Sequence, residues 1–130
     1  MDRTILLVED DPSLAAVLQR ILRRLDARVD HVAYGREALC RIARNDLDLV
    51  VLDLDLPDLD GTEVCRAARV GGYSGPVLVL TARHGEEPRD ESLDAGADDF
   101  LTKPFSVAEL MSRLSVLLSE DTGVGRGRAV

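Results

Sequence analysis

Residues 50–61, VVLDLDLPDLDG, contain four aspartates directly after an apolar run: Asp53, Asp55, Asp58 and Asp60. A carboxylate at the end of a buried strand can act as a nucleophile or as a ligand for a metal ion. Asp58 and Asp60 fall in a turn before the next helical pattern, and turn formation is their expected role. Asp53 and Asp55 are therefore the candidates for chemistry in this segment.

Comparable side chains follow three other apolar segments. Glu9, Asp10 and Asp11 follow residues 4–8, Thr81 ends residues 75–81, and Lys103 follows residues 98–102. Crowded carboxylates raise one another's pKa unless a cation joins them, and hard oxygen ligands of this kind suit Mg²⁺. A hydroxyl and an ammonium beside that metal would suit an anion such as a phosphoryl group. Asp11 is the exception, because it stands where an N-cap is expected.

Lys103 has independent support from composition. Fifteen of the sixteen basic residues are arginine, and Lys103 is the only lysine of the chain. An ammonium is a compact point charge on a flexible stem, whereas a guanidinium is a planar fork. A lysine at this one position indicates that such a point charge is needed there.

The candidate residues stand at the ends of predicted strands, which alternate with predicted helices along the chain. The predicted strands are residues 4–8, 27–32, 47–52, 75–81 and 98–102, and the predicted helices are residues 12–25, 35–45, 61–69, 86–95 and 106–119. Near-continuous apolar strands are typical of parallel sheets covered on both faces. We expect an α/β fold of the flavodoxin-like (βα)5 type, an open parallel sheet in strand order 2-1-3-4-5 with helices on both faces. That order brings the carboxyl ends of the first, third, fourth and fifth strands to one edge of the sheet, where the candidate residues would meet.

Length and composition limit the class of protein. The 130 residues suit one domain, residues 1–119, followed by a flexible tail or linker over residues 120–130. The net charge of −8 argues against nucleic-acid binding by this domain itself. No membrane span or secretory signal is recognisable, so a cytoplasmic location without membrane contact is expected. Cys40 and Cys65 fall in helical patterns and are expected to be buried apolar side chains.

Four segments together resemble the response-regulator receiver domains of two-component signalling, over roughly residues 3 to 119. They are LLVEDD (6–11), DLVVLDLDLPDLDG (48–61), VLVLTAR (77–83) and GADDFLTKPF (96–105). Each is weak alone, whereas their order and spacing make the resemblance specific. The family accepts a phosphoryl group from a sensor histidine kinase on one aspartate, uses Mg²⁺, and switches a distal face. It is not a class of enzymes with a separate substrate, although self-phosphorylation from small donors and self-dephosphorylation are expected.

The resemblance assigns a role to each candidate. Asp53 matches the phosphorylated aspartate, and Glu9, Asp10, Asp53 and the backbone carbonyl of Asp55 match the Mg²⁺ site, Glu9 through water. Thr81 and Lys103 match the residues that hold phosphoryl oxygens. Thr81 and Phe100 match the switch pair, in which the hydroxyl moves toward the phosphoryl group and the aromatic ring turns inward.

A further set resembles the dimerisation face of the OmpR/PhoB-like subfamily. Its members are Arg89, Asp98, Asp99, Glu109 and Arg113, at helix 86–95, strand 98–102 and helix 106–119. The resemblance implies a homodimer on phosphorylation and transcription regulation. DNA would be bound through a C-terminal effector domain that is not present in this sequence.

Two alternatives remain open. DLD at 53–55 also resembles the nucleophile motif of haloacid-dehalogenase-type phosphatases, with Thr81, Lys103 and Asp98–Asp99 as the later groups. Three points tell against this alternative. In that family the motif ends the first strand and the acidic pair follows the lysine, whereas here DLD follows the third predicted strand and Asp98–Asp99 precede Lys103. Such enzymes also carry a cap, for which 130 residues leave no room. The other alternative is a stand-alone or phosphorylation-independent receiver that acts by docking to a protein.

Asp55 departs from the receiver pattern, which often has an uncharged residue there. Arg83 lies two residues after Thr81, and Asp55 two after Asp53. Since the third and fourth strands are expected to be neighbours, these two side chains are predicted to meet at the mouth of the site. Such a pair would set the lifetime of the phosphoryl group.

Overall fold

Five strands and five helices alternate along the chain in a computed structural model that describes residues 3–120. The strands are β1 (Arg3–Val8), β2 (Ala27–Val32), β3 (Leu49–Asp53), β4 (Val77–Thr81) and β5 (Asp99–Thr102). The helices are α1 (Pro12–Arg23), α2 (Gly35–Ile42), α3 (Gly61–Val70), α4 (Glu86–Asp94) and α5 (Val107–Glu120). Apart from Glu120, the predicted tail over residues 120–130 lies outside the described residues.

Every predicted element is present, and the largest difference in bounds is at α2. This helix ends at Ile42 rather than at residue 45, because Ala43 is its C-cap and Asn45 has a φ of 59°. A residue in the left-handed region cannot continue a right-handed helix. Asp53 is the last residue of β3 rather than the first residue after it.

The strands form one parallel sheet in the order β2-β1-β3-β4-β5, which confirms the predicted topology. All residues of β3 and β4 are buried, as expected for central strands covered on both faces. The carboxyl ends of β1, β3, β4 and β5 therefore lie side by side at one edge.

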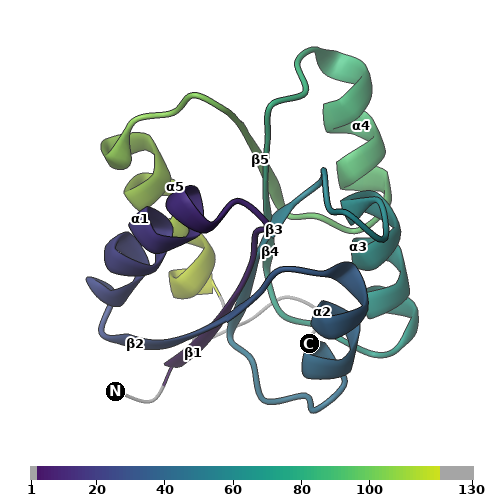
Figure 1. The fold of residues 1–130 in the computed structure, drawn as a ribbon, viewed down its shortest axis with the longest axis horizontal. Coiled ribbons are helices and arrows are strands. Elements are labelled where there is room, and N and C mark those ends of the chain that lie inside the picture. The colour runs from purple at the N-terminus through teal and green to yellow at the C-terminus, as the bar shows by residue number, and fades with distance from the viewer. Residues whose placement is uncertain (1–2, 121–130) are drawn as a thin grey trace.

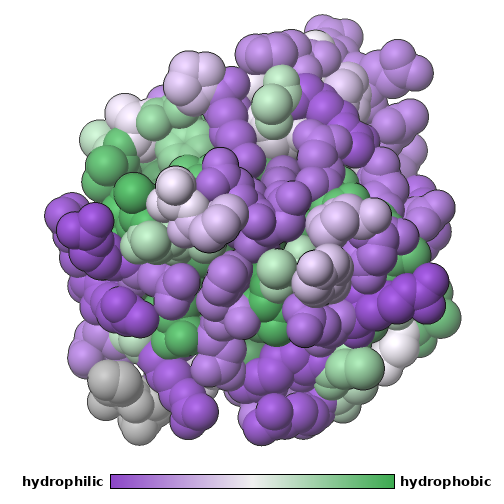
Figure 2. Space-filling view, in the orientation of Figure 1, coloured by the Kyte–Doolittle hydropathy of each residue, from purple (hydrophilic) through white to green (hydrophobic). Residues whose placement is uncertain are grey.

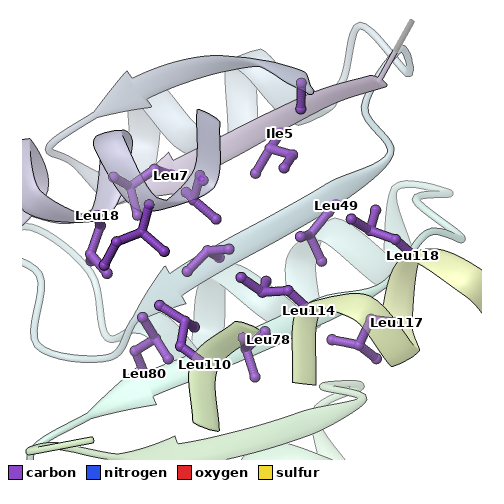
Figure 3. Packing of buried hydrophobic residues seen from close by; sticks show 14 of the residues in the cluster. Ile5, Leu7, Leu18, Leu49, Leu78, Leu80, Leu110, Leu114, Leu117 and Leu118 are labelled. Carbon is purple, nitrogen blue, oxygen red and sulfur yellow. The ribbon is translucent and has the colours of Figure 1, made fainter. Parts of the chain in front are cut away.

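Two helical layers cover the sheet, α1 and α5 on one face and α2, α3 and α4 on the other (Figure 1). Figure 3 shows the first layer, where Leu110 and Leu114 of α5 lie near Leu78 and Leu80 of β4, and Leu18 of α1 lies near Leu7 of β1. On the other face of the sheet, a second hydrophobic core contains Val64 and Ala68 of α3 together with alternate residues of β1, β3 and β4. Because successive strand side chains point to opposite faces, each central strand serves both cores.

Local capping explains where two helices begin. The Asp11 carboxylate accepts hydrogen bonds from the N–H groups of Ser13 and Leu14, which confirms the expected N-cap of α1. At α5, Ser106 Oγ accepts from Glu109 N–H at 3.0 Å, and Glu109 Oε1 accepts from Ser106 N–H at 3.1 Å. This reciprocal pair is a capping box.

The surface is mainly polar. On the face in Figure 2, hydrophilic residues cover most of the area and hydrophobic residues form scattered patches. Cys65 is buried as predicted, but the prediction for Cys40 is wrong, since it is exposed on α2. Among the described helices, none has the length and apolar character required to cross a membrane.

Candidate functional site

Three carboxylates gather where β1 and β3 end. Glu9 and Asp10 follow β1, and Asp53 is the last residue of the neighbouring strand β3. One carboxylate oxygen from each residue lies within 4.8 Å of the other two. Glu9 is 2% exposed and Asp53 is 5% exposed, whereas Asp10 faces solvent. Two of the three charges are thus removed from water, which favours a bound cation.

The end of β5 brings the single ammonium to this cluster. Lys103 Nζ donates a hydrogen bond to Glu9 Oε1 at 3.3 Å and lies 3.6 Å from Asp53 Oδ1. Residues 9 and 103 are 94 positions apart, so this contact depends on the sheet order. The structure confirms that the predicted acids and the predicted lysine lie together.

Electrostatics at Glu9 show that one ammonium does not balance the site. Burial, and then the charge of Asp53, raise the pKa of Glu9, and they outweigh the Asp11 N–H and Lys103, which lower it. Carboxylate oxygens with this excess of negative charge are the donor set that Mg²⁺ prefers. The residues present therefore fit the expected metal.

Thr81 ends β4 next to Asp53 in the sheet and is fully buried. Its Oγ1 accepts a hydrogen bond from Arg83 N–H at 3.1 Å, which connects it to the start of the β4–α4 loop. Phe100, on the neighbouring strand β5, is 8% exposed and packs in the core that α2, α3 and α4 cover. Both switch candidates thus lie on adjacent strands at the β4–β5 side of the site.

The predicted contact between Asp55 and Arg83 is present. Arg83 Nε and Nη2 donate to Asp55 Oδ1 at 3.1 and 2.8 Å. Arg83 Nη2 also donates to Asp60 Oδ2 at 2.8 Å, while Asp60 Oδ1 accepts from Thr62 N–H as the N-cap of α3. The Asp55 carboxylate therefore faces Arg83, and its expected metal contact would be through the backbone carbonyl.

The sequence did not reveal two of these connections. Asp60 was expected only to form a turn, but it binds Arg83 across 23 positions. His31 on β2 places a ring nitrogen 2.8 Å from the carbonyl oxygen of Glu9, beside the acid cluster. The sequence carries no local signal for either contact, because both partners come from different elements.

Several of the proposed dimer-face residues have partners within the chain. Arg89, Glu109 and Arg113 line one hollow together with Phe100. Arg113 Nη1 donates to Asp99 Oδ1 at 2.6 Å within the same chain. Asp98 instead accepts from Arg69 of α3 at 3.0 Å and from Val77 N–H at 2.8 Å. The carboxylate of Asp98 thus serves contacts with α3 and β4 within the chain, and its part in a dimer face stays a prediction.

The same contacts weigh against the phosphatase resemblance. Asp98 and Asp99 stand at the amino end of β5, and Lys103 follows its carboxyl end. The acidic pair is thus at the opposite end of the strand from the lysine and does not join the acid cluster. The candidate nucleophile Asp53 ends the third strand, as the sequence indicated.

An open parallel sheet in this order, with acids gathered at its carboxyl edge, defines a flavodoxin-like α/β protein with a site at the topological switch point. Residues 5–115 match the model of the family described as response regulator receiver domain. The chain belongs to this family, the receiver domains of two-component response regulators.

A curated relative and two solved structures support this assignment. The transcriptional regulatory protein TcrA of Mycobacterium tuberculosis strain H37Rv is 49% identical over 113 residues, which cover 87% of this chain and 45% of TcrA. This chain thus spans about half the length of that relative. The likeness to a transcriptional regulator agrees with the expected OmpR/PhoB-like subfamily.

The receiver domain of the Francisella response regulator 1452 has a TM-score of 0.86 and 32% identity, covering 92% of this chain and 99% of that one. The receiver domain of the sensor histidine kinase PA1611 from Pseudomonas aeruginosa has a TM-score of 0.83 and 36% identity, with the same coverage of both chains. Its structure has a magnesium ion coordinated in the active-site cleft.

Proposed function

We propose that this receiver domain is a signalling switch that accepts a phosphoryl group from a sensor histidine kinase on Asp53. The observation that supports this best is the cluster of Glu9, Asp10 and Asp53, in which Lys103 donates a hydrogen bond to Glu9. A buried carboxylate beside an ammonium and a hydroxyl is suited to nucleophilic attack on a phosphorus atom and to holding the group transferred.

The transfer can be written from the residues present. An Asp53 carboxylate oxygen forms a bond to phosphorus, the phosphorus–nitrogen bond of the phosphohistidine breaks, and its electron pair returns to the imidazole nitrogen. Lys103 Nζ pairs with one phosphoryl oxygen, and the hydroxyl of Thr81 donates to another. Water attack on the same phosphorus later returns the free carboxylate and inorganic phosphate. No separate substrate is turned over, so the domain is not an enzyme in the usual sense.

Asp10 and Asp53 would bind Mg²⁺ directly, Glu9 would act through water, and Asp55 would contribute its backbone carbonyl. When bound, this ion would neutralise the charge that builds up on the phosphoryl oxygens. The magnesium described for the PA1611 receiver domain supports this choice of metal.

Output would pass through α4, β5 and α5. Thr81 moves toward the phosphoryl group, Phe100 turns further inward, and the surface beside Arg89 and Arg113 changes. The resulting homodimer would control transcription through an effector domain outside this chain. The description of TcrA as a transcriptional regulatory protein supports the control of transcription. We expect the protein to act in the cytoplasm.

The test is labelling with acetyl phosphate or phosphoramidate and Mg²⁺, read by intact mass. The wild-type protein and Asp55→Asn should each gain one phosphoryl group, and Asp53→Asn should gain none. Undiminished labelling of Asp53→Asn would show that another residue is the acceptor. Steady turnover of small phosphate esters would instead favour the phosphatase alternative.

A further inference from the structure

The loop between β3 and α3, residues 54–60, forms most of the wall of a cleft beside the acid cluster. The cleft has a volume of about 360 Å³ and is lined by this loop with Asp10 and Arg83. The loop includes Asp55, whose backbone carbonyl is a proposed Mg²⁺ ligand. What holds the loop in place therefore affects the proposed site directly.

The base of the loop is closed by its own backbone. Gly61 N–H donates to the Leu54 carbonyl at 2.8 Å, and Asp55 and Asp60 form an isolated antiparallel bridge. A Cβ on Gly61 would lie 2.5 Å from the Asp53 carbonyl oxygen, so glycine permits this close return of the chain. These contacts fix the two ends of the loop but not its tip at residues 56–59.

Asp58 connects the tip to the start of α2. Its Oδ1 accepts from Gly35 N–H at 2.7 Å, and its Oδ2 accepts from Arg36 N–H at 3.0 Å. These are two of the N–H groups that a helix leaves without an internal partner. The N-cap residue Tyr34 makes no side-chain capping bond, so a loop 23 positions away caps this helix.

Gly35 makes the connection possible. A Cβ at this position would lie 2.9 Å from Val64 Cγ2 and 3.0 Å from Leu59 Cβ. The first turn of α2 thus packs directly against both the loop and α3. A side chain at position 35 would press against Leu59 and move α2 away from the loop that carries Asp58.

We propose that Asp58 is a positioning residue of the phosphorylation site, which anchors the β3–α3 loop to α2 and so keeps the Asp55 carbonyl in place before metal or donor arrives. Asp58 touches no reacting atom, and its action passes through the loop backbone. A loop that is already ordered loses less conformational entropy when it binds an ion, so binding is tighter. The effect on Mg²⁺ rests on the proposed function, whereas the anchoring is a property of the metal-free protein.

The first measurement is amide hydrogen exchange of residues 55–60 in the metal-free protein. In Asp58→Ala, exchange in this loop should become about tenfold faster, the scale set by loss of a capping contact. Mg²⁺ affinity, measured by titration, should fall about threefold or more. Asp58→Asn keeps one acceptor oxygen and should be intermediate, which supplies a milder variant if Asp58→Ala does not fold.

A matched control separates anchoring from general loss of stability. Ser106→Ala removes the N-cap of α5, on the opposite face of the sheet, and should lower stability without changing loop exchange or Mg²⁺ affinity. If Ser106→Ala weakens Mg²⁺ binding as much as Asp58→Ala does, the role assigned to Asp58 is wrong.

A second control separates the loop from the helix. Tyr34→Asp, added to Asp58→Ala, gives α2 a cap of its own, since residue 34 already has the extended backbone of an N-cap. Stability should recover while the loop still exchanges fast and Mg²⁺ still binds weakly. If stability, slow loop exchange and Mg²⁺ affinity all recovered, Asp58 would act only by stabilising α2, and the proposal would be overturned.

Failure of the proposed function would look different. If the wild-type protein bound no Mg²⁺ and took no phosphoryl group, hydrogen exchange would still decide whether Asp58 anchors the loop. If labelling of Asp53 succeeded but Asp58→Ala left loop exchange unchanged, the anchoring would be refuted and the proposed function would stand.

Discussion

At Glu9 and Asp53 the protein holds two nearly buried carboxylates against one ammonium, that of Lys103. Burial of unbalanced charge is costly, and it is a common property of functional sites rather than of structural ion pairs. Burial, and then the charge of Asp53, raise the pKa of Glu9. This arrangement agrees with the proposed binding of a cation and with the proposed transfer of a phosphoryl group.

The contact between Asp55 and Arg83 allows a prediction about the lifetime of the phosphoryl group. Their side chains are 56% and 31% exposed, so the pair contributes about 0–1 kcal/mol to stability. Because the pair lies at the mouth of the site, it should slow the approach of water. Asp55→Ala and Arg83→Ala should each dephosphorylate about two- to fivefold faster, with little change in the unfolding midpoint.

The two changes should not be additive. Once either partner is removed, the other no longer covers the site, so the double variant should resemble the single variants. Decay of the phosphorylated form, followed by intact mass, gives the three rates. Asp60→Asn, which removes charge from the second partner of Arg83, should have a smaller effect. Strictly additive effects of Asp55→Ala and Arg83→Ala would show that they act separately.

At the scale of elements, Arg69 connects α3 to two loops, the one between α3 and β4 and the one between α4 and β5. Its guanidinium donates to the carbonyl oxygens of Tyr73, Gly75 and Gly96 at 2.6–3.1 Å and to the Asp98 carboxylate at 3.0 Å. It also lies over the Tyr73 ring, 5.3 Å from the centroid. One side chain thus donates to carbonyl oxygens of two separate loops.

Loss of Arg69 should destabilise the fold without affecting the chemistry. Arg69→Ala removes the hydrogen bonds to three part-buried carbonyl oxygens, and we expect a loss of about 2–3 kcal/mol in the free energy of unfolding. Arg69→Lys should not rescue it, because an ammonium lacks the planar fork. Urea denaturation measures the change, and Arg66→Ala, on the exposed side of α3, is the control expected within about 0.5 kcal/mol of wild type. A neutral Arg69→Ala would show that water replaces these bonds.

At the scale of the whole molecule, the strands β4 and β5 connect the acid cluster at β1 and β3 with the proposed output face. Thr81 and Phe100 belong to these adjacent strands, and α4 packs beside them. α4 buries little apolar surface, with Ser92 as its buried residue. A weakly packed helix next to the site can change position at low cost.

Dimerisation should depend on charges of this face. Within one chain Arg113 binds Asp99, and in a twofold dimer the same groups can pair across the axis. With beryllofluoride and Mg²⁺, wild-type protein should dimerise, and Arg113→Glu or Asp99→Arg alone should weaken the dimer about tenfold or more.

Mixing the two single variants gives the decisive measurement. Across their interface every contact between residues 99 and 113 is between opposite charges, whereas each variant alone brings like charges together. Sedimentation should therefore show a heterodimer in the mixture. Monomers in the mixture and in the activated wild-type protein would count against the OmpR/PhoB-like mode of assembly and favour docking to a different protein.

The sequence by itself determined the elements and most of the site. Apolar runs at residues 47–52 and 75–81 indicated central strands, and the acids and hydroxyl at their ends then meet at one edge because parallel strands share a direction. Lys103 could be assigned from composition, since it is the only lysine of the chain. These features are local, or follow from a topology that the strand pattern restricts.

The tertiary structure alone decided which acids serve the fold. Asp58, Asp60 and Asp98 look alike in sequence, but Asp58 caps α2, Asp60 binds Arg83 and Asp98 binds Arg69. Their partners are 23, 23 and 29 positions away, respectively. A carboxylate accepts from any donor within reach, and which donor comes within reach depends on how helices and loops pack. That choice is made by long-range packing, which no local pattern of residues encodes.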